Sequence, residues 1–184
     1  QVNAEGGLEF DLGGTGVQAQ ARSTILQDEA LKKNADNPVN GFARYAMLSV
    51  NVAPFDNADC RKAVLHAADH EAIQGAYGGE LGGAIGTTLM PPNVVGYQEA
   101  DPYGFLDNPN GNPDEATKSL EACGQPDGFS TKIAVRGDRP KEVAAAEALQ
   151  QSLDKVGITA EIQQYPSGDW GAQFAGNPEF VKAN

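Results

Sequence analysis

The two histidines of this chain, His66 and His70, stand four residues apart. In a helix this spacing places both imidazoles on one face, where they can bind a metal ion. The zinc-protease pattern also requires glutamate directly after the first histidine, and Ala67 occupies that position. Asp69 favours a helix start between the two histidines, because aspartate is a preferred N-cap residue. We therefore expect two surface histidines and no metal site.

A second candidate for chemistry is the glycine-rich segment 14–19, which reads Gly-Thr-Gly-Val-Gln-Ala. It follows a short predicted strand over 7–12 and fits the G-x-G-x-x-A turn that binds a pyrophosphate. That fingerprint also needs a helix, then a second strand that ends in an acid about 20 residues on. The corresponding region, 32–38, is a turn cluster instead. We favour a plain glycine-rich turn and no cofactor. A nucleotide-dependent enzyme built on the Gly14 turn is the alternative from another class of protein.

The segment 107–115 is rich in oxygen ligands of the kind that calcium prefers. A calcium loop needs acids or asparagines at alternate positions, and Pro109 and Gly111 stand where two of them belong. The same segment is typical of a helix start, with Asn112 as the cap and Pro113 as the first helical residue. We expect the capped helix.

Charge and motif content narrow the function further. The chain has 13 Lys+Arg against 25 Asp+Glu, a net charge of −12. A surface this acidic repels phosphate, which disfavours nucleic acid and anionic membranes as partners. The sequence has no G-x-S-x-G motif and no nucleophile with an identifiable histidine and acid behind it. It also has no apolar run long enough to cross a bilayer and no leader pattern. We expect a protein that is not an enzyme, whose sequence begins after a targeting segment or inside a longer chain.

The elements that would position a binding site are clearest in the last third of the chain. Segments 131–135 and 158–162 alternate apolar and polar residues, and a helical apolar stripe runs over 141–156 between them. Strand, helix and strand of these lengths predict a βαβ unit with parallel strands. Ligands bind beyond the carboxyl ends of such strands, where Arg136 and Trp170 follow the two strand ends. Arg136 can bind a carboxylate with two hydrogen bonds, and Trp170 can form an apolar wall.

The preceding part of the chain predicts further pieces of one α/β domain. The nearly continuous apolar segment 43–52 predicts a buried strand covered on both faces, which ends at Pro54. Apolar residues over 60–67 recur at helical spacing, and Asp69 predicts the start of a second short helix over 70–77. Segment 78–90 is glycine-rich and irregular.

Four ordered blocks of this sequence resemble a known family. Residues 54–73 contain Pro-Phe-Asp, Arg-Lys-Ala and Ala-Ala-Asp, followed by Ile73. The further blocks are 91–97, 114–128 and 145–158. In this order and spacing they are similar to the extracellular solute-binding proteins of peptide and nickel ABC importers, of the oligopeptide- and dipeptide-binding type.

The resemblance implies one lobe of a two-lobed periplasmic-binding-protein-like fold, with a mixed sheet flanked by helices. Residues 1–42 would be a partly irregular lobe-entry segment, and 43–184 the second lobe, truncated at its C-terminal end and lacking the first lobe. The implied cargo is a peptide, with nickel, a sugar or an opine as alternatives, passed to an ABC permease. The resemblance also implies an extracellular or periplasmic protein, anchored as a lipoprotein through a missing N-terminal part.

Residue roles carry over at few positions. Arg136 is similar in position to the residue that holds the ligand carboxylate in dipeptide-binding members. Trp170 is similar to an aromatic that walls the pocket in oligopeptide-binding members. Arg61 and Asp69 match motif positions that we interpret as structural, and Phe55 is expected in the core.

Cys60 and Cys123 are the only cysteines, each on the apolar face of a predicted short helix. Two buried thiols and one disulfide both fit this placement. Because the resemblance implies export to oxidising surroundings, we favour the disulfide. It would close a loop of 63 positions, which in the chain-entropy treatment stabilises the fold by about 4 kcal/mol.

Overall fold

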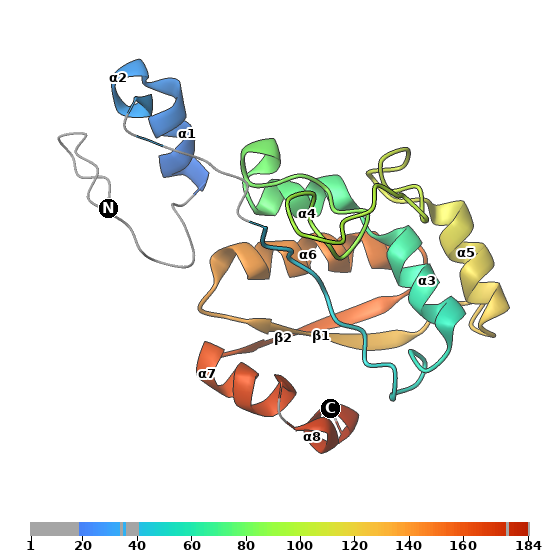
Figure 1. Ribbon diagram of the computed structural model, residues 1–184. Helices are drawn as coiled ribbons and strands as arrows, with labels where there is room; N and C mark the ends of the chain where they lie inside the picture. Colours follow the sequence, from blue (N-terminus) through green and yellow to red (C-terminus); the bar gives the residue numbers. More distant parts are fainter. Residues whose placement is uncertain (1–18, 34, 36–40, 176, 184) are drawn as a thin grey trace.

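The computed structural model describes residues 19–33, 35, 41–175 and 177–183 (Figure 1). The elements in chain order are α1 (Ala19–Gln27), α2 (Glu29–Lys32), α3 (Ala58–Ala67), α4 (His70–Ala76), the 3-10 turn η1 (Gly79–Leu81), α5 (Pro113–Ala122), β1 (Ser130–Arg136), α6 (Pro140–Asp154), β2 (Thr159–Tyr165), α7 (Ser167–Trp170), the π-helical turn η2 (Gly171–Ala175) and α8 (Pro178–Ala183). This mixture of helices and strands confirms the predicted α/β class.

The predicted βαβ unit is present. β1 and β2 pair in parallel, from Ser130 opposite Thr159 to Arg136 opposite Tyr165, and α6 connects them. Two glycines with positive φ bring the strand starts together. A Cβ on Gly128 (φ 83°) would lie 2.0 Å from the carbonyl oxygen of Gly157 (φ 83°), so no side chain fits there.

The core lies between the strands and the helices on one face of the sheet (Figure 1). α6 packs along both strands, and α3 and α5 pack against each other at one end. The main cluster of buried residues comes from α3, α5, the end of α6 and the start of β2: Ala63, Val64, Ala67, Ala116, Leu120, Leu153, Ile158 and Ala160. The helical stripe predicted over 60–67 is therefore the buried face of α3.

Helix ends follow the predicted capping. Asp69 and Asn112 accept backbone N–H bonds at the starts of α4 and α5 as predicted, and Pro113 is the first residue of α5. Asn57 caps α3 in the same way. Arg61 has a structural contact, because its guanidinium donates to the carbonyl oxygen of Phe55 at 2.6 Å. The Phe55 ring packs against the core and meets Phe129 edge-on, with 5.6 Å between ring centroids.

Cys60, near the start of α3, and Cys123, the C-cap of α5, are joined by a disulfide in the structure. Their Cα atoms are 5.3 Å apart, and Cys60 is almost fully buried, with 1% of its surface exposed. The bridge links the two helices that carry much of the core.

The predicted buried strand over 43–52 is wrong. The segment has no strand structure, and Tyr45 and Met47 are 67% and 64% exposed. A strand needs a neighbour to receive its hydrogen bonds, and among the described residues the sheet consists of β1 and β2 alone. For the same reason the described sheet is purely parallel, where a mixed sheet was expected. Only Leu48 from this segment packs against the core.

No helix among the described residues is both long enough and apolar enough to cross a membrane. The strand predicted over 7–12 lies outside the described residues.

Candidate functional site

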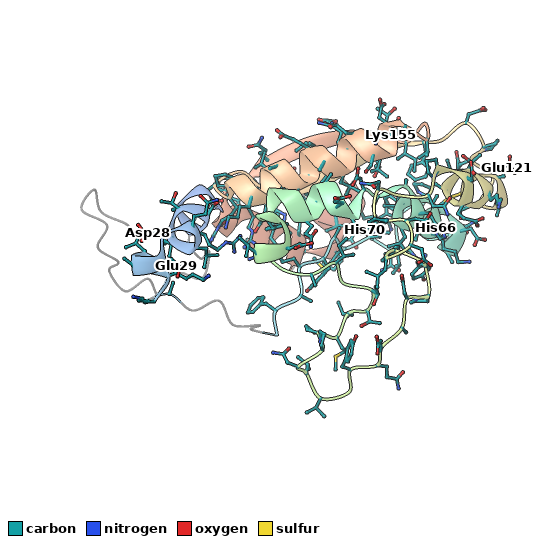
Figure 2. The ribbon with its side chains drawn as sticks, turned by 90° about the horizontal axis from the view of Figure 1, so that it is seen from above. Asp28, Glu29, His66, His70, Glu121 and Lys155 are labelled. Atoms are coloured by element: carbon teal, nitrogen blue, oxygen red, sulfur yellow. A yellow bond between two sulfur atoms is a disulfide. The ribbon has the colours of Figure 1, made fainter. Side chains whose placement is uncertain are left out.

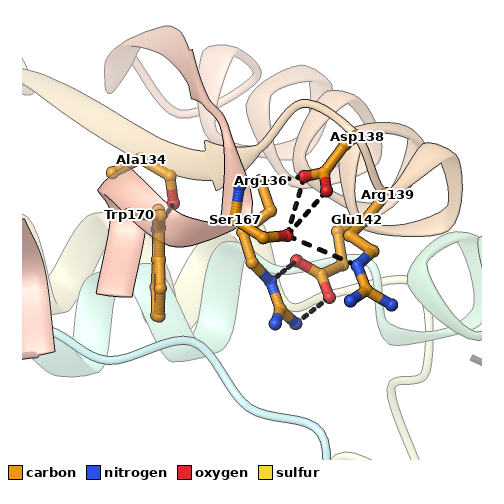
Figure 3. Close-up of polar contacts among 7 residues, drawn as sticks. All are labelled: Ala134, Arg136, Asp138, Arg139, Glu142, Ser167 and Trp170. Carbon is orange, nitrogen blue, oxygen red and sulfur yellow. Dashed lines mark hydrogen bonds and ion pairs between the residues drawn. The ribbon is translucent and has the colours of Figure 1, made fainter. Parts of the chain in front are cut away.

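Arg136 and Trp170 meet at the carboxyl edge of the sheet, where the sequence places them (Figure 3). Arg136 is the last residue of β1, and Trp170 is the last residue of α7, which follows β2. The Arg136 guanidinium carbon lies 5.6 Å from the centroid of the indole ring, in reach of a cation–π contact. The indole N–H donates to the carbonyl oxygen of Ala134 at 3.3 Å, which fixes the ring beside the strand end.

The Trp170 ring belongs to an aromatic cluster that holds the C-terminal segment together. Its centroid is 6.1 Å from that of Phe174, and Phe174 in turn contacts Tyr165 at 5.2 Å and Phe180 at 5.3 Å. These rings come from β2, η2 and α8. The indole is thus supported from behind by packed rings.

The guanidinium of Arg136 already has an acidic partner. Glu142, in the first turn of α6, accepts hydrogen bonds from Nε and Nη2 of Arg136, the first of them at 2.8 Å (Figure 3). Both side chains are partly buried. The hydrogen bond from Arg136 to Glu142 holds the pKa of Arg136 above its ordinary value, against the opposing effect of burial. A ligand carboxylate at Arg136 has to displace or share this bond.

A second polar contact ties the start of α6 to α7. The Ser167 hydroxyl donates to the Asp138 carboxylate at 2.7 Å, and the Ser167 backbone N–H donates to the same group at 3.1 Å. The hydrogen bond from the Ser167 hydroxyl is the main reason why the pKa of Asp138 lies below its usual range. Arg139 reaches the same hydroxyl at 3.4 Å. The edge of the sheet is therefore held in place by side chains from three elements (Figure 3).

Sequence reasoning missed Glu142, Asp138 and Ser167. The available signal was an acid in the first turn of a helix that directly follows the strand bearing Arg136. Acids at that position favour the positive end of the helix dipole whether or not an arginine is near. The pattern therefore did not indicate an ion pair.

The two histidines differ from the prediction of surface residues. Both are partly buried, and His66 Nδ1 and His70 Nε2 are buried atoms without a hydrogen-bond partner. The His70 ring lies 4.1 Å from the Phe105 ring, centroid to centroid, and His66 meets Tyr103 at 5.8 Å. Burial lowers the pKa of His70. Both aromatic rings belong to the loop between η1 and α5, which packs against the two histidines (Figure 2).

The other candidates for metal or cofactor chemistry do not converge on a site. Within the described part of the chain, no three His, Cys, Asp or Glu residues gather closely enough to hold a metal ion. In segment 107–115, Asn112 caps α5 and Asn110 donates to Glu71 at 2.8 Å, as a turn leading into a capped helix requires. The Gly14 turn lies outside the described residues.

Comparison with known proteins places this chain in a family. Residues 14–182 match the family described as bacterial extracellular solute-binding proteins, family 5 middle. The structure is similar to a clavulanic acid biosynthesis oligopeptide binding protein 2, with a TM-score of 0.83 and 34% identity over 91% of this chain and 30% of that one. It also resembles a dipeptide binding protein from Pseudoalteromonas in complex with Met-Leu, with a TM-score of 0.54 and 28% identity over 66% of this chain and 24% of that one.

A curated relative is the glutathione-binding protein GsiB of Salmonella choleraesuis, 29% identical over 134 residues. The match covers 72% of this chain but only 25% of the relative, so the chain spans about a quarter of the length of the curated relatives it matches. The family match covers nearly the whole chain, and the fold agrees with it. The chain belongs to family 5 of the bacterial extracellular solute-binding proteins.

Proposed function

We propose that this chain is part of the substrate-binding component of an ABC importer, and that the component captures peptides outside the membrane. The proposal is supported by relatives whose names describe binding of oligopeptides, a dipeptide and glutathione. Members of such a family bind and release their solute unchanged, so we expect no turnover. Nickel, sugar and opine binding on the same fold are the alternatives that affinity measurements separate from peptide binding.

The observation that carries the proposal is the meeting of Arg136 and Trp170 at the carboxyl edge of β1 and β2. A cation beside a fixed aromatic wall suits a peptide, which offers a carboxylate together with apolar side chains. We propose that both residues contact the ligand. Arg136 would do so while it remains bonded to Glu142 or after it exchanges that partner for a ligand carboxylate.

An exposed apolar face supports a larger parent protein. Large apolar side chains that a folded protein normally covers line an open groove beside segment 41–47: Phe42, Tyr45, Met47, Leu89 and Met90. We propose that a first lobe of the same polypeptide covers this face, with 43–184 as the second lobe and 1–42 as the segment that enters it. The short span of the chain relative to its relatives agrees with this.

We further propose an extracellular or periplasmic location, a lipoprotein anchor on the parent protein and an ABC permease as its partner. In such a protein the two lobes close on the ligand and expel water, which is where most of the affinity arises. One lobe leaves the other side of the ligand in water. The 184-residue chain should therefore bind peptides only in the millimolar range or more weakly, which corresponds to about 4 kcal/mol.

The test is calorimetry with a panel of di- and tripeptides, on this chain and on the longer parent. In the parent, Arg136→Ala should weaken binding by about 2–5 kcal/mol, because the charge pair is buried when the lobes close. Lys155→Ala is the matched control, because it deletes an exposed cation directly after the C-terminal end of α6, and it should leave the peptide affinity unchanged. Absence of peptide binding by the parent would overturn the function, and an unchanged affinity of Arg136→Ala would remove Arg136 from the site.

A further inference from the structure

A flap in the long loop between η1 and α5 covers the two histidines (Figure 2). We call residues 101–111 the flap. Its Phe105 ring lies 4.1 Å from the ring of His70 and 5.6 Å from the ring of Tyr103, centroid to centroid. Tyr103 in turn meets His66 at 5.8 Å. Because Phe105 is only 8% exposed, these ring contacts anchor the flap in the interior.

The two ends of the flap are held differently. Hydrogen bonds to α3 and α4 tie its C-terminal end, among them the bond that the Asn110 amide donates to the Glu71 carboxylate at 2.8 Å. Residues 101–106 are shaped from within, because the Asp101 carboxylate accepts the backbone N–H of Phe105 at 2.9 Å. This part rests on the histidines through its aromatic rings. Its position therefore depends on the state of the imidazoles.

The His70 ring lies where a second proton is unfavourable. Its Nε2 atom is buried and has no hydrogen-bond partner among the residues that the structure describes. In the neutral imidazole one nitrogen carries no proton, so Nε2 can stay an unused acceptor. In the imidazolium both nitrogens carry protons, and a buried N–H of a charged ring needs an acceptor. The phenyl ring of Phe105, which lies over the imidazole, has no oxygen or nitrogen to accept it.

The charges around His70 do not remove this cost. The titratable groups on its own helix start, on α3 and on the flap are His66, Asp69, Glu71, Asp101 and Tyr103. Burial lowers the pKa of His70, and this effect outweighs the charges of Asp69 and Asp101, which favour the imidazolium. α6 also packs against α4, but its first turn lies at the other end of that helix, and Glu147 and Asp154 further along are exposed.

We propose that protonation of His70 detaches residues 101–106 from α3 and α4, so that the flap opens in mildly acidic surroundings. In the open flap the imidazolium lies in water and donates both N–H groups to water. The bonds at the C-terminal end of the flap stay in place and form the hinge. The ordinary pKa of histidine is about 6.5, so a change from neutral to mildly acidic pH is enough to drive this step. Because the open form takes up the proton more readily, its population rises as the pH falls.

The test is backbone amide hydrogen exchange in the unaltered 184-residue chain at pH 8 and pH 5, corrected for the intrinsic effect of pH on exchange. Protection of the Phe105 and Leu106 amides, which both donate to Asp101, should fall severalfold at pH 5. The Asp101 carboxylate stays ionised over this range, because an ordinary aspartate titrates near pH 4, about 3.9. Unchanged protection of both amides would overturn the inference.

Low concentrations of urea separate flap opening from global unfolding. Exchange at Phe105 should respond little to urea, because a local opening exposes little new surface. Exchange at Val135, which is buried in β1, should accelerate with urea, because it requires the core to unfold. Flap amides that follow Val135 in urea would show global unfolding alone and overturn the inference.

A matched pair of variants assigns the pH dependence to one ring. His70→Asn should make the flap protection independent of pH between 8 and 5, whereas His66→Asn, the same substitution at the neighbouring ring, should keep the pH dependence. A pH dependence that persists in His70→Asn would overturn the role of His70.

A measurement on the ring itself requires no substitution at His70. The imidazole resonances of the unaltered chain come from two histidines, and His66→Asn assigns them. His70 should be less than half protonated at a pH of about 6.5, where an ordinary histidine is half protonated. A ring that titrates like an ordinary histidine would overturn the inference, because the closed flap would then not oppose the proton. No peptide enters these measurements, so their failure leaves the proposed function untouched.

Discussion

Removal of the Cys60–Cys123 disulfide should destabilise the chain strongly. The bridge closes a loop with a sequence separation of 63 residues. Loop closure of that size restricts the unfolded chain by an amount worth about 4 kcal/mol at room temperature. Cys60→Ala/Cys123→Ala should lower the free energy of unfolding by that amount. For a domain of this length the melting temperature should fall by roughly 10–15 °C.

Urea unfolding with and without dithiothreitol is the assay. Reductant should bring the unaltered chain close to the stability of the double alanine variant, and it should leave that variant unchanged. A thiol titration of the unfolded, unreduced protein should find no free thiol. Two titratable thiols per chain, or a double variant as stable as the unaltered protein, would refute the reasoning and weaken the argument for an exported protein.

Three further predictions concern the strand starts, a histidine and the ion pair. Gly128→Ala should lower the free energy of unfolding in urea by about 1–3 kcal/mol more than Gly124→Ala does. Both glycines have positive φ, but only a Cβ on Gly128 would collide with a backbone oxygen. The free energy of unfolding should fall as the pH drops below about 6.5, because His70 takes up a proton more readily in the unfolded chain than in the fold, where burial lowers its pKa. His70→Asn should flatten this decline in urea titrations between pH 8 and 5. Glu142→Gln should strengthen the binding of carboxylate-bearing peptides by roughly fivefold, or about 1 kcal/mol, because it releases the Arg136 guanidinium; weaker binding in calorimetry would show that the pair must stay closed.

Periodicity and capping residues predicted the local elements well. The stripe over 141–156 and the alternating segments beside it predicted β1, α6 and β2, because their apolar residues face a core built largely from the same unit. Asp69 and Asn112 predicted two helix starts, since a cap acts on backbone groups only two or three residues away. The meeting of Arg136 and Trp170 followed from the parallel topology.

Features that depend on distant partners could not be predicted in this way. The apolar segment 43–52 has the composition of a strand, but pairing needs a neighbour that the described residues do not supply. Glu142 neutralises Arg136 only because the turn after β1 points α6 back over the strand end. Arg22 and Arg44 both contact Tyr77, and no sequence pattern connects such distant positions.

The single tryptophan of the chain permits the most direct test of the proposed binding site. Trp170 lies against Arg136 at the carboxyl edge of the sheet, so its fluorescence reports the site where we place the ligand. Titration of the 184-residue chain with tripeptides should shift the emission of Trp170 with a midpoint in the millimolar range, and Arg136→Ala should weaken or abolish this response. A saturating peptide that binds by calorimetry but leaves the emission unchanged would place the site elsewhere and contradict the account.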